Sequence, residues 1–264
     1  MPQSAVLVLR LAGPLQSWGR PSRYNRRETH HQPTKSGILG LLAAAEGRPR
    51  EAPITDLLAL RLGVRTDQPG SLLRDYHTVS DHRGLPMPSS QVNAKGIQKK
   101  TSPAKHTGVT KRYYLQDAVF TAALRGPAPL LTALEHAIRA PAFPLSLGRR
   151  SCPPTGPVSK GLYPDTTLLD VLSSVPWLAA AHHRNQTRGA LVTLAATLED
   201  PDGEHRITDT PDTYNLRTGT VFSSRSVSHT PITIPTGHAP SEARDDLPGT
   251  DPASGHDPFA LLGW

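Results

Sequence analysis

The stretch that decides the fold reads QPTKSGILGLLAAAEG and occupies residues 32–47. Four of its apolar residues follow the spacing i, i+3, i+4 and i+7: Ile38, Leu41, Leu42 and Ala45. This period predicts a short helix with one stripe buried against a sheet. Gly40 lets another backbone approach closely, and Gly47 is a suitable helix stop.

The N-terminal end of this helix is polar. Thr34 or Ser36 can cap it, and the free amides of the first turn point outward beside Lys35. Together these groups favour an anion such as a phosphate. The alternative is that Lys35 is an ordinary solvated residue, and these residues alone favour neither interpretation. The stretch is not a nucleotide-binding P-loop, because no Gly-x-x-x-x-Gly-Lys-Ser/Thr precedes the helix.

The composition indicates a basic protein without a disulfide framework. Its 264 residues suit one large domain, or one domain with a smaller companion. Lys and Arg number 29 against 22 Asp and Glu, and the formal charge of +7 suits a polyanion such as nucleic acid. The single cysteine, Cys152, excludes an internal disulfide and fits a reducing cytoplasm. No apolar stretch approaches the ~20 residues that cross a bilayer, so we expect a cytoplasmic protein with no membrane contact.

Apolar patterns around the first helix predict an α+β domain over residues 1–158. Residues 5–11 are a nearly continuous apolar run that suits a central strand. The other predicted elements are strands at residues 58–65, 113–124 and 143–147 and a helix at residues 129–139. The resulting βαββαβ order matches the ferredoxin-like arrangement. There both helices cover one face of the sheet, and we expect Arg61 and Arg65 on the open face.

Two segments have the composition of a nucleic-acid contact. The first, residues 16–32, interleaves aromatic and basic side chains: Trp18, Tyr24, Arg20, Arg23, Arg26 and Arg27. Guanidinium groups contact phosphates and rings stack on bases, although an ordinary basic loop has the same composition. The second, residues 67–112, has eight Lys/Arg, three Asp and no regular period, which is typical of a long loop that is either functional or disordered. One interpretation is an arm that orders on binding a phosphate backbone. Its candidate contacts are Lys99, Lys100, Lys111 and Arg112.

The rest of the chain shows weaker patterns. Residues 190–198 and 231–235 are strand candidates, which predicts a smaller β-rich part over residues 159–236. Residues 237–264 are rich in Pro, Gly, Asp and Ser, which is typical of a disordered tail. The closing apolar residues, which include Phe259 and Trp264, fit a frayed end.

Four motifs together resemble one protein family. They are LRLAGPLQSWGRP from Leu9, PTKSGILGLLAAAEG from Pro33, LRDYHTV from Leu73 and SLGRRSCPPTGPV from Ser146. In this order they resemble the CasD family, the subunit of the type I-E CRISPR Cascade complex that holds the 5′ handle of the guide RNA (crRNA). The resemblance implies a ferredoxin-like domain of the RAMP superfamily (RRM-like) with a basic thumb before its third strand. It also implies two protein partners, the Cascade backbone subunit and the large subunit, and through the latter an indirect link to target DNA near the protospacer-adjacent motif.

The resemblance also implies site residues. Handle contacts are expected at the helix tip (Lys35, Ser36 and Gly37) and in the loop after the fourth strand (Arg149, Arg150 and Ser151). Tyr76 and His77 are expected at the base of the thumb. These residue types suit the task, because a splayed RNA handle needs stacking surfaces for its bases and cations or amides for its phosphates. The alternative for Arg149 and Arg150 is a pair of solvated arginines in a Pro-rich loop.

We expect no catalytic residue and no cofactor. The second hypothesis is a metal-independent endoribonuclease that processes precursor crRNA, in which Tyr76, His77 and Lys111 act as general acid–base groups. The type I-E resemblance argues against it, because there a different subunit processes the RNA. The histidine pairs and Cys152 lack metal-ligand spacing. A DNA-binding regulator would explain the charge, but no helix-turn-helix or zinc-finger pattern is present.

Overall fold

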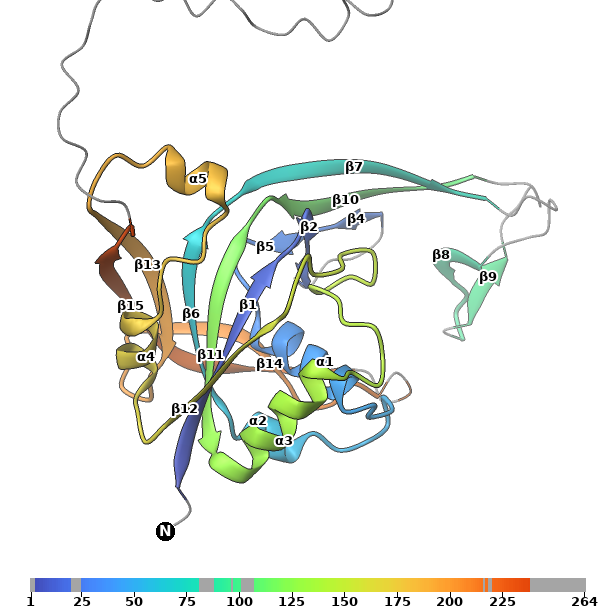
Figure 1. The fold of residues 1–264 in the computed structure, drawn as a ribbon. Coiled ribbons are helices and arrows are strands. Elements are labelled where there is room, and N and C mark those ends of the chain that lie inside the picture. The colour runs from blue at the N-terminus through green and yellow to red at the C-terminus, as the bar shows by residue number, and fades with distance from the viewer. Residues whose placement is uncertain are drawn as a thin grey trace, which may run out of the picture.

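A seven-stranded sheet forms the centre of the computed structural model, with strand order β12-β1-β11-β6-β13-β15-β14 and every neighbouring pair antiparallel (Figure 1). Its strands are β1 (Ser4–Ala12), β6 (Arg61–Gln68), β11 (Val119–Pro127), β12 (Ser159–Pro164), β13 (Leu191–Glu199), β14 (His205–Pro211) and β15 (Phe222–Pro235). The structure describes residues 3–19, 25–80, 88–95, 97–100, 107–215, 217 and 220–237.

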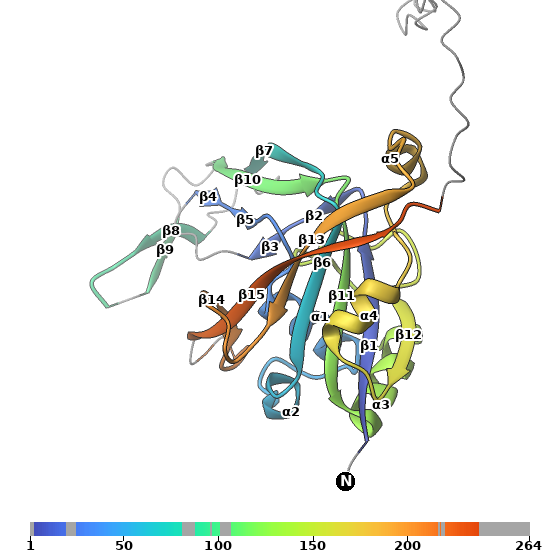
Figure 2. The same ribbon diagram turned by 90° about the vertical axis from the view of Figure 1, so that its left-hand side faces the viewer.

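Both faces of this sheet are covered (Figures 1 and 2). The helices α1 (Lys35–Ala45), α2 (Thr55–Leu58) and α3 (Ala128–Arg139) pack on one face, and α4 (Leu168–Ser174) packs on the other. The strand β1 therefore has apolar side chains on both sides: Leu7 and Leu9 join the first core, whereas Val6 and Val8 join the second. This double burial explains its continuous apolar sequence.

The expected open face is wrong, because α4 and the segment after it cover it. Arg65 is fully buried there and forms an ion pair with Asp67 (Nε to Oδ1, 2.7 Å). Its guanidinium also donates to the carbonyl oxygens of Leu172, of Val175 (2.8 Å) and of Pro176 (2.8 Å), at the end of α4. Arg65 therefore ties α4 to the sheet and is not available to a ligand.

The helix predicted in residues 32–47 is confirmed as α1. Thr34 caps it by accepting a hydrogen bond from the Gly37 amide at 3.2 Å. Gly47 follows the helix with φ of +75°, a conformation that glycine adopts without strain. The four residues of the predicted stripe are buried: Ile38, Leu41, Leu42 and Ala45.

The third and fourth predicted strands differ from the observed ones. Residues 113–124 form two strands, the end of β10 (Gly108–Gln116) and the start of β11, with Asp117 between them at φ of +57°. Residues 143–147 form a loop, and the edge strand beside β1 is instead β12. The sequence of β12, SKGLYP, has too few apolar residues to indicate a strand.

The segment 67–112 contains regular structure where its sequence shows no period. The strand β7 (Ser71–Val79) pairs with β10 over their full lengths, and this two-stranded ribbon extends away from the central sheet (Figure 1). Short strands lie outside the central sheet: β2 (Leu15–Gln16), β3 (Trp18–Gly19), β4 (Arg26–Arg27), β5 (Thr29–His30), β8 (Pro88–Val92) and β9 (Gln98–Lys100). β2 and β4 pair with β10, β3 pairs with β5, and β8 pairs with β9.

The chain after residue 158 shares the sheet of the residues before it. The strand β12 lies at one edge, and β13 joins β6 so that β15 and β14 extend the other side. A short helix, α5 (Ala181–Asn185), precedes β13. The sheet therefore continues across the expected boundary at residue 158. The predicted tail lies outside the described residues from residue 238 onward.

Candidate nucleic-acid interface

Three strands place basic and aromatic side chains on one face of the ribbon. Lys111 of β10 pairs with Tyr76 of β7 on one side and with Arg26 of β4 on the other. Tyr113 of β10 pairs with Arg74, and its ring centre lies 5.1 Å from the guanidinium carbon of Arg26. Paired residues, and residues two apart on a strand, share a face. These five side chains therefore form one surface, the ribbon face.

The ribbon face has the chemistry of a single-stranded nucleic-acid site. Tyr76 is 66% exposed, so its ring can stack on a base. Lys111, Arg74 and Arg26 are exposed cations, of which Arg26 also forms an ion pair with Glu28 at 2.8 Å. Aromatic platforms beside cations bind bases and phosphates with little dependence on sequence.

Three predicted contacts lie on the opposite face of the ribbon: Arg27, His77 and Arg112. Each is adjacent in sequence to a member of the ribbon face, and successive side chains of a strand point to opposite sides. His77 Nδ1 lies 3.7 Å from a carboxylate oxygen of Asp75, and Arg112 Nε donates to Thr110 Oγ1 at 3.2 Å. The predicted ribbon residues are thus divided between two faces.

The loop that follows residue 147 is fixed against the start of the chain. Gly148 has φ of +87°, and a Cβ atom built on it would lie 1.8 Å from the carbonyl oxygen of Ser17. The Ser17 amide donates to the carbonyl oxygen of Leu147 at 3.0 Å. Only glycine fits this close approach of two backbones.

Arg149 connects this loop to the ribbon. Its guanidinium carbon lies 4.7 Å from the centre of the Tyr114 ring. It also donates to the carbonyl oxygens of Tyr113 (3.1 Å) and Arg27 (2.9 Å). Arg149 is thus occupied within the chain, whereas the neighbouring Arg150 points elsewhere, into a pocket.

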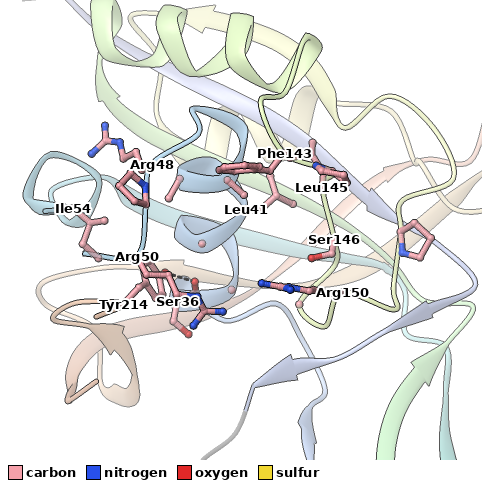
Figure 3. A pocket seen from close by; sticks show the side chains of 18 residues that line it. Ser36, Leu41, Arg48, Arg50, Ile54, Phe143, Leu145, Ser146, Arg150 and Tyr214 are labelled. Atoms are coloured by element: carbon pink, nitrogen blue, oxygen red, sulfur yellow. Dashed lines mark hydrogen bonds between the residues drawn. The ribbon is translucent and has the colours of Figure 1, made fainter. Parts of the chain in front are cut away.

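This pocket, the α1 pocket, has a volume of about 830 Å³ and lies between α1, residues 48–54 and residues 143–153 (Figure 3). Its apolar lining includes Leu41, Leu145 and Phe143, and Phe143 is 52% exposed. The predicted contacts Ser36 and Gly37 line it as well. Ser36 uses its backbone carbonyl to accept a hydrogen bond from Tyr214. Desolvation raises the pKa of Tyr214 and keeps its hydroxyl a donor.

The arginines of the α1 pocket differ in their pairing. Arg48 is neutralised by Glu46 (2.7 Å) and Asp56 (2.7 Å from Nη1 to Oδ1), and the Arg48 guanidinium lowers the pKa of Asp56. Arg50 and Arg150 are exposed and form no ion pair or hydrogen bond with any described residue. Two unneutralised guanidinium groups thus line a partly apolar pocket.

The structure corrects the prediction for Lys35. The side chain is 3% exposed, and its Nζ binds both carboxylate oxygens of Glu199, at 2.9 and 3.1 Å. Its backbone amide donates to Asp209 Oδ2 at 2.8 Å, and Asp209 also pairs with Arg225. A carboxylate of β14 thus occupies the helix terminus that the sequence offers to a phosphate.

The remaining predicted contacts are scattered. Ser151 is exposed and lies beside Cys152, and Lys99 and Lys100 are exposed on β9, outside the central sheet. Arg20 lies outside the described residues.

Four candidate residues were missed by sequence reasoning: Arg74, Tyr113, Arg50 and Phe143. The alternation of Arg74 and Tyr76 is visible in LRDYHTV and could have indicated a shared strand face. The pairing of that face with Lys111 and Arg26 depends on strand register, which has no local signal here. Arg50 and Phe143 meet only through folding, because nothing in their sequence contexts connects them.

The groups of the nuclease hypothesis do not converge. Tyr76 and Lys111 share the ribbon face, whereas His77 lies on the other face. Within the described ranges, no three His, Cys, Asp or Glu side chains are grouped to hold a metal ion. Two of the candidate metal ligands are engaged or buried instead. His182 contacts Asp117 at 2.9 Å, and Cys152 is buried, which raises the pKa of its thiol.

Comparison with known proteins identifies the family. The sequence profile described as CRISPR-associated protein (Cas_Cas5) matches residues 6–234. The chain belongs to this family. It is 38% identical over 176 residues to the CRISPR system Cascade subunit CasD of Escherichia coli (strain K12), which covers 60% of this chain and 70% of that protein. This agrees with the family resemblance of the sequence.

Solved structures resemble this family member over most of its length. A chain described as part of a CRISPR RNA-guided surveillance complex superposes with a TM-score of 0.67 at 30% identity, covering 87% of this chain and 91% of that one. A chain described as a Cas protein gives a TM-score of 0.63 at 34% identity, covering 89% and 99%. Among the described residues of this Cas5 chain, no helix is both long and apolar enough to cross a membrane.

Proposed function

We propose that this Cas5 chain is the non-catalytic crRNA-binding subunit of a type I-E Cascade complex and caps the 5′ handle of the guide RNA. The similarity to CasD supports the complex, and the ribbon face supports the ligand. That face is the single observation that carries the proposal, because it combines an exposed ring with cations in one row.

The strand order supports a ferredoxin-like core within the larger sheet. The four strands β12, β1, β11 and β6 are adjacent, and α1 and α3 follow β1 and β11 in the chain. This is the fourth-first-third-second order of the ferredoxin-like arrangement. The ribbon formed by β7 and β10, together with β8 and β9, is then the thumb that precedes the third strand.

The thumb is also the proposed contact with the Cascade backbone subunit. Apart from Tyr76, which is assigned to RNA, its strand β7 exposes Leu72 (55%) and Val79 (48%), which is an unusual amount of apolar surface for one strand. The second protein partner is the large subunit, which would link the chain indirectly to target DNA. We assign no RNA cleavage, because Tyr76, His77 and Lys111 do not face one site.

Substitutions on the ribbon face test the proposal. Tyr76→Ala should weaken binding to RNA that carries the repeat-derived handle about 5- to 100-fold, whereas Tyr76→Phe should retain most of it, because the ring carries the stacking. Phe222→Ala, at another exposed aromatic residue (39%), is the matched control and should bind like the wild type. Equal binding by Tyr76→Ala and the wild type would refute the ribbon face as the RNA site.

A further inference from the structure

The α1 pocket has two chemically different walls. In Figure 3 the ring of Phe143 lies on one side of the pocket, and Arg50, Ser36 and Arg150 lie on the other. Phe143 is 52% exposed although it is a large apolar residue, and Leu41 and Leu145 extend its apolar surface. An aromatic wall that faces two cations suits a ligand with one flat apolar part and one anionic part.

Charge in the pocket favours a phosphate as the anionic part. No Asp or Glu lines the described pocket. Glu46 and Asp56 are paired with Arg48, and Glu51, which follows Arg50 in sequence, is exposed and is not part of the lining. Arg50 and Arg150 remain available, and arginine forks fit phosphate oxygens with two hydrogen bonds each. The volume of about 830 Å³ falls within the usual range for sites that enclose a small organic ligand.

The pocket is also connected to the ribbon. Arg150 lines the pocket, and Arg149 beside it donates to the backbone of Arg27 and Tyr113. One short loop therefore borders both the pocket and the strands that carry the ribbon face. Because Arg149 lies over Tyr114, whose side chain is on the opposite side of β10 from Tyr113, an RNA strand on the ribbon face would have to cross the edge of the ribbon to reach the pocket.

We infer that the α1 pocket holds one unstacked nucleotide of the bound RNA, with its base on Phe143 and an adjoining phosphate between Arg50 and Arg150. This inference rests on the proposed RNA-binding function and adds two residues to it, Arg50 and Phe143. A base that is not stacked on its neighbours in the RNA needs another flat apolar surface, and the phosphate of that nucleotide is then accessible to cations. The site selects a nucleotide by shape and charge together.

The test combines base removal with substitution of the ring. Repeat-derived RNAs with one abasic position each are bound to the full-length wild type and to Phe143→Ala. One abasic position should weaken wild-type binding about tenfold and leave Phe143→Ala unchanged, because the lost contact is the same in both cases. Phe143→Trp should restore the sensitivity, and Phe222→Ala should respond like the wild type.

The phosphate is tested in the same way. A methylphosphonate at the linkage beside that position removes one negative charge, and it should weaken the wild type most, Arg50→Ala and Arg150→Ala less, and the double variant not at all. Each arginine variant should also reduce the slope of log affinity against log salt by about 1. Arg188→Ala, at an exposed arginine outside the pocket, is the matched control and should keep the wild-type response to the methylphosphonate.

Three outcomes separate this inference from the proposed function. If Tyr76→Ala weakens handle binding but no abasic position is coupled to Phe143, the pocket inference fails and the proposed function stands. If the wild type does not prefer handle RNA over scrambled RNA, both fail. Trp18 and Trp177 are buried, so quenching of tryptophan fluorescence by acrylamide reports on Trp264. In the absence of RNA, Trp264 could be protected from acrylamide in the wild type and exposed to it in Phe143→Ala. That result would assign the pocket to the chain's own C-terminal residues and overturn the inference.

Discussion

The guanidinium of Arg149 lies 4.7 Å from the centre of the Tyr114 ring and connects the loop at residues 148–151 to the ribbon. Its hydrogen bonds to the carbonyl oxygens of Tyr113 and Arg27 use the planar fork of the arginine. Sequence alone presents Arg149 and Arg150 as equivalent neighbours. In the structure, Arg149 is bound to other residues of the chain, whereas Arg150 is available to a ligand.

Arg149→Lys should destabilise the protein even though it keeps the charge. Lysine cannot stack on Tyr114 or reach both carbonyl oxygens, and hydrogen bonds to charged groups each contribute about 1.5–3 kcal/mol. Urea unfolding measures the loss. Arg150→Lys is the matched control and should unfold like the wild type. Unchanged stability of Arg149→Lys together with full RNA binding would show that Arg149 serves only as a charge.

Lys35→Met should destabilise the protein by about 3 kcal/mol, because removal of one partner leaves a buried ion pair incomplete. Among the described residues, the Glu199 carboxylate would then keep the Leu62 amide (3.1 Å) and the more distant Arg225 (3.7 Å). Lys160→Met, at an exposed lysine of β12, should have little effect. Normal stability with lost RNA affinity in Lys35→Met would restore the phosphate role that the sequence suggests.

Gly148→Ala should disturb the loop strongly. The new Cβ atom would meet the Ser17 carbonyl oxygen at 1.8 Å, and φ of +87° is itself unfavourable for alanine. We expect a lower melting temperature and weaker RNA binding. Gly156→Ala places its Cβ atom in open space and should change neither quantity. Equal melting of the two variants would contradict the close approach at Gly148.

The Cys152 thiol should be protected in the folded protein. Burial raises its pKa, so the reactive thiolate is less populated at pH 8 than in the unfolded chain. The raised pKa also means that this group's contribution to stability is present below about pH 8.5, the ordinary cysteine value, and declines as the pH rises through the folded value. Iodoacetamide at pH 8 should label the native protein slowly and the urea-unfolded protein quickly. Equal labelling rates would contradict the burial of the thiol.

The central elements of the fold follow from apolar periodicity, and its edges do not. Residues 32–47 and 129–139 read as helices because one stripe of each is buried, and β1 reads as a strand because it is apolar on both sides. The strand β7 is exposed on both faces and β10 is half-buried along most of its length, so neither sequence shows an apolar alternation. β12 and β14 lie at sheet edges and carry polar residues for the same reason.

The candidate site was predictable in composition but not in geometry. The sequence indicates that arginines and aromatic rings in segments 16–32 and 67–112 suit RNA. It does not contain the register that pairs Tyr76 with Lys111, nor the fold that brings Glu199 to Lys35 across 164 residues. A lysine at a helix start looks the same in sequence whether a phosphate or a carboxylate of the same chain will face it.

The most direct test of the account is equilibrium binding of the full-length chain to RNA with the repeat-derived 5′ handle, beside a scrambled RNA of equal length, at two salt concentrations. We expect the chain to prefer the handle RNA at both concentrations and to leave the RNA uncut. Equal, strongly salt-dependent binding to both RNAs would contradict it, because that behaviour belongs to a general polyanion binder.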